Sequence, residues 1–196
     1  MIKFIIFSLF ITETIIIIFL LILLLKQRSI LHKNQLVELE KWHHMAFTDD
    51  LTKIPNRAAY NRHISKIQKS IGKADKTSGI ILFDIDNFKK INDTYGHLEG
   101  DRTLQLVSSI LTNIFCEPNY CVYRIGGDEF AVIAEDITEQ DIVDMLLELR
   151  HYENTENIYL SKGYSMICSR ENIDIAFSRA DEMLYADKSS KKQKML

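Results

Sequence analysis

The feature that most constrains this chain is an apolar run from Phe4 to Leu25, which is 22 residues long and is interrupted only by Ser8 and the cluster at residues 12–14. A helix of this length crosses roughly 30 Å of hydrocarbon, so the run predicts a transmembrane anchor over residues 1–25. A cleaved signal peptide is the alternative, but its apolar region is typically only about 7 to 15 residues long and ends at a small-residue cleavage site. The anchor is therefore the preferred interpretation.

Basic residues follow the apolar run. Lys26, Arg28 and Lys33 come after it, whereas only Lys3 and the amino terminus precede it. Positive residues concentrate on the cytoplasmic side of a membrane helix. The asymmetry predicts a single pass through the inner (cytoplasmic) membrane, with the carboxyl-terminal part in the cytoplasm.

Residues 26–46 contain neither proline nor glycine and predict a helical linker, which is either a dimerising stalk or a helix packed on its own domain. Residues 47–196 then have room for one domain. The formal net charge of −3 gives no basic excess, so nucleic acid is not an expected partner. Three cysteines, Cys116, Cys121 and Cys168, are predicted to be reduced and buried.

Apolar periodicities within residues 47–196 predict alternating helices and strands. Helices are expected at residues 55–70, 97–115, 141–150 and 173–188, and strands at residues 80–84, 121–125, 130–133 and 158–167. Gly126 and Gly127 separate the second and third strands and predict a tight hairpin, because both glycines can adopt positive φ. The order predicts an α+β, ferredoxin-like fold with a largely antiparallel sheet and flanking helices.

Acidic residues gather at the end of one predicted strand and directly after the glycine pair. Asp84 and Asp86 end the strand, and Asp128 and Glu129 follow the glycines. Converging carboxylates usually need a cation, and Mg²⁺ fits oxygen ligands of this kind. A calcium loop starting at Asp84 is excluded because Lys89 occupies the position that requires glycine.

Five motifs occur in order along residues 47–192. They are Asp50-Leu51-Thr52-x-Ile54-Pro55-Asn56-Arg57, Asp84-x-Asp86-x-Phe88-Lys89-x-x-Asn92-Asp93, Gly96-His97-x-x-Gly100-Asp101, Arg124-x-Gly126-Gly127-Asp128-Glu129-Phe130 and Ala180-Asp181-x-x-Leu184-Tyr185. Together they resemble the motifs of the GGDEF domains, the diguanylate cyclases. The resemblance implies a GGDEF, nucleotidyl-cyclase-like fold that condenses two GTP into cyclic di-GMP and releases pyrophosphate. It also implies a homodimer in which each subunit presents one GTP to the other.

The resemblance implies roles for the matched residues. Asp84, the Ile85 carbonyl, Asp128 and Glu129 would bind Mg²⁺ or, in its place, Mn²⁺, and the last two residues would also be catalytic. The implied substrate contacts are Asn92 and Asp101 at the guanine edge, His97 along the substrate, Lys89 and Lys188 at the phosphates, and Gly126 and Gly127 at the hairpin backbone. A purely structural role is an equal alternative for Asp86, Asp93, Arg124 and Lys188.

The chain departs from the family pattern near its end. Ser161-Lys162-Gly163 stands where Ser-Ile-Gly is usual, and residues 187–193, Asp-Lys-Ser-Ser-Lys-Lys-Gln, stand where Ala-Lys-x-x-Gly-Arg-Asn is usual. The phosphate-facing arginine is thus replaced at best by Lys192, which loses bidentate geometry. A catalytically weak or inactive GGDEF module that binds GTP or a partner protein is therefore the alternative function.

Many family members carry an Arg-x-x-Asp pair that begins nine residues before the glycine pair and binds the inhibitory product. The corresponding residues here are Glu117 and Tyr120. An arginine offers a fork of donors to an anion, whereas Glu117 would repel one. We therefore expect no product inhibition through this segment.

Overall fold

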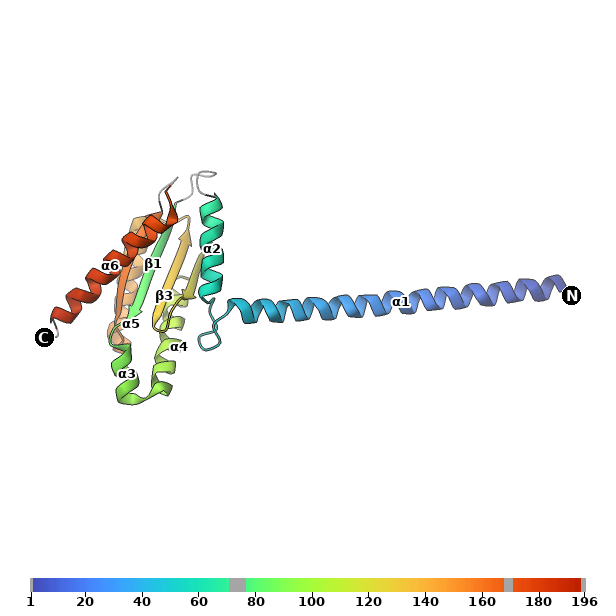
Figure 1. Cartoon of the computed structure of the whole chain (residues 1–196), viewed down its shortest axis with the longest axis horizontal. Coiled ribbons are helices and arrows are strands. Elements are labelled where there is room, and N and C mark those ends of the chain that lie inside the picture. Colours follow the sequence, from blue (N-terminus) through green and yellow to red (C-terminus); the bar gives the residue numbers. More distant parts are fainter. Residues whose placement is uncertain (1, 71–76, 168–170, 195–196) are drawn as a thin grey trace. The chain divides into compact units, whose positions relative to one another are not determined.

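Figure 1 shows a computed structural model that describes residues 2–70, 77–167 and 171–194, with side chains described from residue 19 onward except those of residues 70 and 194. The chain divides into two compact units, Met1–Met45 and Ala46–Leu196. The predicted site residues all belong to the second unit.

The first unit consists of most of helix α1 (Ile2–Phe47), which runs without a break through the predicted linker. Among the residues that the structure describes, no helix combines the length and hydropathy that a membrane crossing requires. The predicted transmembrane anchor is therefore not supported by this part of the chain. The side chains of residues 2–18, which make up most of the predicted anchor, lie outside those described.

The second unit is built on a four-stranded sheet in the order β2-β3-β1-β4. The strands are β1 (Ser78–Ile85), β2 (Tyr120–Arg124), β3 (Glu129–Glu135) and β4 (Leu160–Ile167). All three neighbouring pairs are antiparallel. The antiparallel sheet predicted from the sequence is confirmed.

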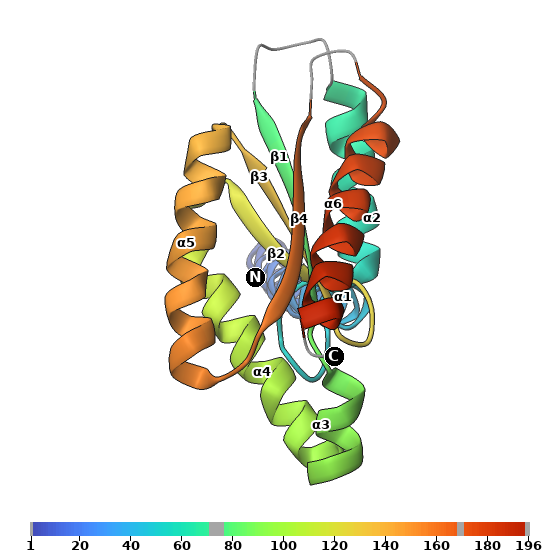
Figure 2. The ribbon, with the colours of Figure 1, turned by 90° about the vertical axis from the view of Figure 1, so that its left-hand side faces the viewer.

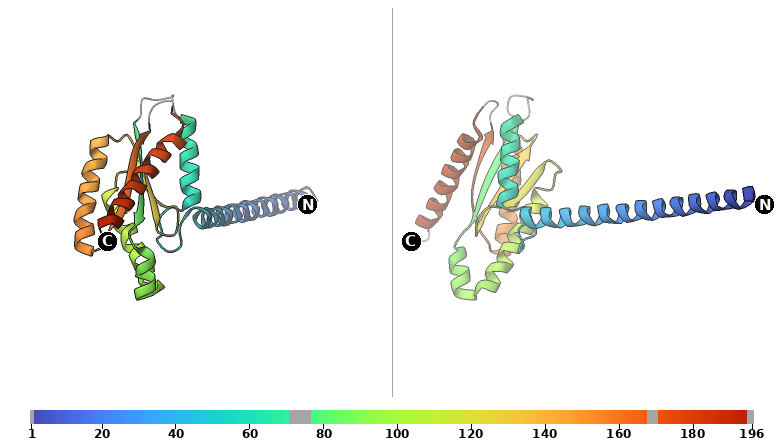
Figure 3. Two further views of the ribbon diagram at one scale, coloured as in Figure 1. Left: turned by 60° about the vertical axis from the view of Figure 1, so that its left-hand side comes forward. Right: turned by 45° about the vertical axis from the view of Figure 1, so that its right-hand side comes forward.

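Helices cover both faces of this sheet. They are α2 (Arg57–Ser70), α4 (His97–Ile114), α5 (Glu139–Glu156) and α6 (Ile173–Lys194), whereas α3 (Phe88–Tyr95) packs against α4. Helices α4 and α5 lie on one face, and α2 and α6 lie on the other (Figure 2). Helix α6 runs obliquely across its face, so its carboxyl-terminal turns come near the end of β1 (Figure 3).

The middle of strand β1, residues 80–83, is apolar at every position because both of its faces are buried. Ile81 and Phe83 pack into the core beneath α4 and α5, whereas Ile80 and Leu82 pack into the core beneath α2 and α6. Successive side chains of a strand point to opposite faces, so a central strand covered on both sides must be apolar throughout. The buried strand fixes the position of Asp84 at its end.

Three predictions differ from the structure. Helix α3 was not predicted, because its eight residues are too short for a helical period to stand out. Gly126 and Gly127 do not have positive φ, and the connection between β2 and β3 spans residues 125–128, so it is not the tight two-residue hairpin expected. Cys116 is exposed and Cys121 is half-buried rather than buried. Cys168 lies outside the described residues.

Candidate active site

Strands β1 and β3 bring predicted acids from two motifs together, beside the glycine loop, residues 125–128, which connects β2 to β3. Asp84 at the end of β1 is the register partner of Glu129 at the start of β3. The Ile85 amide donates a hydrogen bond of 3.2 Å to the Asp128 carbonyl, which fixes the loop beside β1. Asp84 and Asp128 therefore lie at one edge of the sheet.

Asp84 is an unusual carboxylate because it is only 7% exposed. Its Oδ2 atom accepts a hydrogen bond of 2.6 Å from Lys188 Nζ on α6. Its Oδ1 atom is buried and has no hydrogen-bond partner among the described residues. A buried carboxylate oxygen without a partner carries a large desolvation cost, which a bound cation would offset.

The pKa of Asp128 also indicates that this site has too little positive charge for its carboxylates. Burial and the neighbouring negative charge of Asp84 raise it above the usual range of an aspartate. Burial also lowers the pKa of Lys188, but the hydrogen bond to Asp84 and its charge outweigh this and leave the pKa of Lys188 raised. Together, the orphaned oxygen and the two close carboxylates fit a divalent cation bound by oxygen ligands.

Glu129 does not join the two aspartates in this conformation. Its carboxylate lies over Gly126, where an added Cβ atom would collide with Glu129 Oε2. Within the described residues, no group of three acidic, histidine or cysteine side chains is preassembled for a metal. A third ligand would thus come from a side-chain rotation of Glu129 or from the backbone.

The glycine loop is held by a residue whose role the sequence left open. Arg124 donates from Nε and Nη2 to the Gly127 carbonyl, at 3.2 and 2.8 Å, and from Nη1 to Asp49 Oδ1 at 3.0 Å. Burial raises the pKa of Asp49, but hydrogen bonds from Thr52 and Arg124 outweigh burial and lower it. Arg124 therefore positions the loop and is not a solvated strand residue.

Asp49 directly precedes the recognised motif that begins at Asp50, and its contact with Arg124 was not expected from the sequence. Its Oδ1 atom also accepts from the Thr52 amide at 2.9 Å and the Thr52 hydroxyl at 2.7 Å. The signal available in the sequence was the spacing of an aspartate three residues before a threonine, which is typical of a side-chain-capped turn.

The predicted base-reading residues come from the helical pair α3 and α4. The Asn92 side chain lies against Gly100, where a Cβ atom would collide with Asn92 Oδ1. Asp101 follows Gly100 directly and is exposed, so Asn92 and Asp101 are neighbours across the helix pair. Gly96 connects the helices with a φ of 85°, a conformation that favours glycine.

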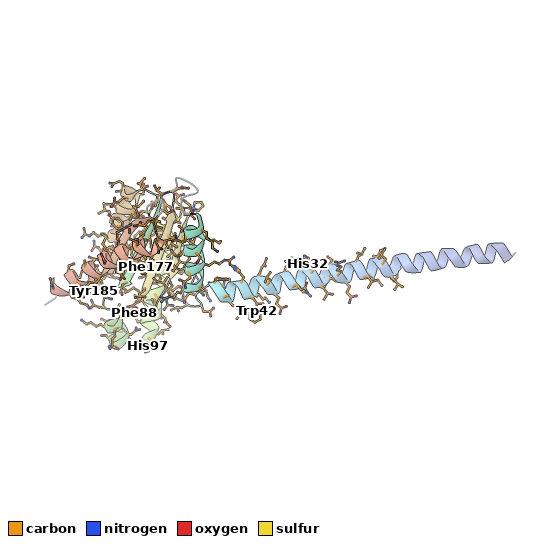
Figure 4. All side chains as sticks on the ribbon, turned by 45° about the horizontal axis from the view of Figure 1, so that its top comes forward. His32, Trp42, Phe88, His97, Phe177 and Tyr185 are labelled. Atoms are coloured by element: carbon orange, nitrogen blue, oxygen red, sulfur yellow. The ribbon has the colours of Figure 1, made fainter. Side chains whose placement is uncertain are left out.

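Two further predicted residues of this region are solvent-accessible. His97 begins α4, and Lys89 lies in the first turn of α3 next to Phe88; Figure 4 labels Phe88 and His97. Both Lys89 and His97 are exposed in the nucleotide-free chain. They form no preassembled site with Asp84 in the described structure.

Known proteins are similar to nearly all of the second unit. The family profile described as "Diguanylate cyclase, GGDEF domain" matches residues 46–194. The chain is 36% identical over 155 residues to a probable diguanylate cyclase, DgcI, of Escherichia coli, which covers 78% of this chain and 34% of that protein. It is 30% identical over 160 residues to an uncharacterized membrane protein of Staphylococcus epidermidis, covering 76% of this chain and 45% of the relative.

A solved structure of the coiled coil and GGDEF domain of DgcB from Caulobacter crescentus, in complex with c-di-GMP, has a similar fold. It superimposes with a TM-score of 0.78 at 26% identity and covers 85% of this chain and 93% of that one. The chain spans less than half the length of the curated relatives it matches.

Proposed function

The chain belongs to the diguanylate cyclase GGDEF-domain family, and we propose on that basis that it condenses two GTP into cyclic di-GMP and releases two pyrophosphates. The observation that carries the proposal is the pair of close carboxylates, Asp84 and Asp128, with an orphaned buried oxygen on Asp84. This charge arrangement suits phosphoryl transfer, in which a protein mainly positions and neutralises its substrate.

The metal set of the proposal comprises Asp84, Asp128 and Glu129 with the Ile85 carbonyl. A divalent cation bound there, Mg²⁺ or Mn²⁺, would neutralise phosphate charge and favour ionisation of the attacking 3′-hydroxyl. Burial of Asp84 and the raised pKa of Asp128 support two of these ligands. Glu129 would contribute after its carboxylate leaves Gly126.

The phosphate contacts of the proposal are Lys89, Lys188 and the backbone of Gly126 and Gly127. Lys188 is supported because its ammonium already lies 2.6 Å from the metal-site carboxylate. Gly127 has no neighbouring atom within 4 Å of its missing Cβ position, so its backbone is open to a ligand.

The base contacts of the proposal are Asn92, Asp101 and His97. A carboxylate such as Asp101 accepts the two adjacent N–H donors of guanine, and an amide such as Asn92 can complement the remaining edge. The packing of Asn92 against Gly100 supports their placement side by side.

Dimerisation and membrane attachment complete the proposal. Each subunit of a homodimer would present one GTP, since one site holds one nucleotide.

The anchor over residues 1–25 remains a prediction, supported by its sequence and by the exposure of Phe19–Leu25, each 46–62% exposed. Retention in the membrane pellet after an alkaline wash supports it, and release into the supernatant contradicts it.

The direct test of the site is pyrophosphate release from GTP by the full chain in detergent with Mg²⁺. Asp84→Asn should abolish release while the variant keeps the circular dichroism spectrum of the parent. An alternative regulator without catalysis would bind GTP and release no pyrophosphate, with or without the substitution. Unchanged release by a folded Asp84→Asn variant would contradict the metal assignment.

A further inference from the structure

Among the lysines in the last turns of α6, Lys188 and Lys191 lie three residues apart and are therefore neighbours on one helix face. Each contacts a different aspartate where β1 ends. Lys188 Nζ lies 2.6 Å from Asp84 Oδ2, and Lys191 Nζ lies 3.0 Å from Asp86 Oδ2. Lys191 stands where the family's closing pattern has glycine, so this second contact is a feature of the present chain.

Lys191 is held by three acceptors. Its ammonium donates to Asp86 Oδ2 at 3.0 Å and to the Leu160 carbonyl at 2.7 Å, and it forms an ion pair with Asp187 Oδ2 at 3.0 Å. Two of its three N–H donors are therefore used in hydrogen bonds, and the Asp187 carboxylate lies beside the same nitrogen. A lysine held in this way is bound by the protein's own acceptors.

Lys188 differs from Lys191 in this respect. Within the described part of the chain, its ammonium makes one hydrogen bond, to Asp84. Two donors remain for another anion. The two lysines therefore have different roles: Lys191 is held by the protein, and Lys188 is available to a phosphate.

The acceptors of Lys191 are fixed in turn by β4. Asp86 Oδ1 accepts a hydrogen bond from the fully buried Ser161 hydroxyl. Asp187 Oδ2 accepts from the Lys162 amide at 3.0 Å. These contacts join the end of β1, the start of β4 and the last turns of α6.

Lys162, the other departure from the family pattern, supports the same contacts. Its Nζ atom lies 2.8 Å from Oε2 of Glu153, whose side chain is only 7% exposed. Glu153 Oε1 also accepts from the Leu160 amide at 2.8 Å. Both departures thus belong to one polar network, in which a buried charge is paired and hydrogen-bonded as it must be.

We propose that Lys191 is a positioning residue that fixes the last turns of α6 through Asp86, Asp187 and Leu160, so that Lys188 is presented to the triphosphate of GTP. The proposal rests on the proposed function. It assigns to the altered closing motif an anchoring role that a glycine at position 191 could not perform.

The test compares Lys191→Met with Lys66→Met, which removes a lysine from the exposed surface of α2. We expect Lys191→Met to raise the KM for GTP by about tenfold, with a smaller change in kcat, because a charge-assisted hydrogen-bond network is lost. Lys191→Arg should restore much of the affinity, because it keeps the charge and the donors. Lys66→Met should leave both constants unchanged.

A double substitution separates positioning from general destabilisation. If Lys191 acts through Lys188, adding Lys191→Met to Lys188→Met should change the KM no further. A tenfold increase in the Lys188→Met background would show that Lys191 acts independently of Lys188, and would overturn the proposal.

Amide hydrogen exchange of the nucleotide-free protein provides a measurement that does not need turnover. Residues 185–193 should exchange faster in Lys191→Met than in the parent or in Lys66→Met. Absence of pyrophosphate release by the parent would refute the proposed function, but hydrogen exchange would still test the anchoring role of Lys191. Unchanged exchange in Lys191→Met would refute the anchoring role itself.

Discussion

Asp128 carries an electrostatic cost in the metal-free protein, because burial and the charge of Asp84 raise its pKa. A raised carboxyl pKa means that the fold favours the protonated form. Its contribution to the free energy of unfolding is fully present below the pKa of the unfolded chain and is lost as pH rises through the higher pKa of the folded protein. Ionised Asp128 therefore destabilises the metal-free fold at neutral pH.

Asp128→Asn should for this reason be more stable and less active than the parent. In EDTA, its melting temperature should exceed that of the parent at pH 7, and the difference should vanish at acidic pH, where the Asp128 carboxyl of the parent is protonated in both the folded and the unfolded chain. Turnover with Mg²⁺ should fall by about a thousandfold, because a metal-held carboxylate contributes several kcal/mol to the transition state. Calorimetry and a pyrophosphate assay measure the two effects. Near-parental turnover by the folded variant would be incompatible with the assignment.

Asp101 is predicted to select guanine over adenine. Its carboxylate can accept two N–H donors from guanine, whereas the corresponding edge of adenine offers no such pair. We expect GTP to be preferred over ATP by at least about a hundredfold in kcat/KM, which is more than a size filter gives. Asp101→Asn should reduce this preference, and the matched Asp93→Asn substitution, at an exposed aspartate of α3, should not. Similar kcat/KM values for the two nucleotides would refute the role.

At the scale of elements, α6 reaches the site because it packs on β4 without an intervening side chain. A Cβ atom at Gly163 would collide with the Ala180 carbonyl and the Leu184 amide, which are backbone atoms of α6 that cannot rotate away. The position of Lys188 against Asp84 therefore depends on a glycine in the adjacent strand.

Gly163→Ala should push α6 from the sheet. We expect a loss of about 1 to 3 kcal/mol in the free energy of unfolding, the range typical of overpacking, together with a higher KM for GTP. Gly127→Ala is the matched control for stability, because nothing lies within 4 Å of its added Cβ atom. Denaturant titration of both variants measures their free energies of unfolding. Equal stability of the two would show that α6 adjusts freely.

The turn that leads into β2 contains Glu117 and Tyr120, the two positions at which the family's product-binding pair would stand. The Tyr120 amide donates to the Glu117 carbonyl at 2.9 Å in a tight turn. Burial and the negative charges of Asp141 and Glu117 raise the pKa of Tyr120. The local negative charge is unfavourable for an anionic dinucleotide.

We therefore predict that micromolar cyclic di-GMP does not inhibit the parent non-competitively. Introducing the family pair, through Glu117→Arg with Tyr120→Asp, should create such inhibition if the surrounding turn is preserved. Initial rates measured across product concentrations test both proteins. Non-competitive inhibition of the parent that disappears on changing Glu117 or Tyr120 would show that the segment does bind product.

The sequence predicted the strands and long helices because their apolar periods are pronounced. Leu104, Val107 and Leu111, the expected inner stripe of α4, are each at most 2% exposed. The short helix α3 and the exposed Cys116 could not be predicted in this way, because eight residues or one side chain carry no period. Tertiary contacts alone reveal that Glu129 lies over Gly126 and that Lys191 bonds to Asp86.

The second unit holds one candidate nucleotide site. Asp84, Asp128 and Lys188 come from β1, the glycine loop and α6, which the antiparallel sheet brings together. A single domain of this kind offers one nucleotide site, whereas a cyclic dinucleotide needs two attacking hydroxyls. The proposed activity therefore requires two subunits, and its rate should rise with the square of protein concentration when the dimer is weak.

The most direct measurement is identification of the product formed from GTP and Mg²⁺ by the full chain, using mass spectrometry together with a pyrophosphate count. We expect cyclic di-GMP as the product, with two pyrophosphates for each molecule formed, and about thousandfold slower formation by the Asp128→Asn variant. Nucleotide-bound protein that yields no cyclic di-GMP, or a product that Asp128→Asn forms equally well, would contradict this expectation.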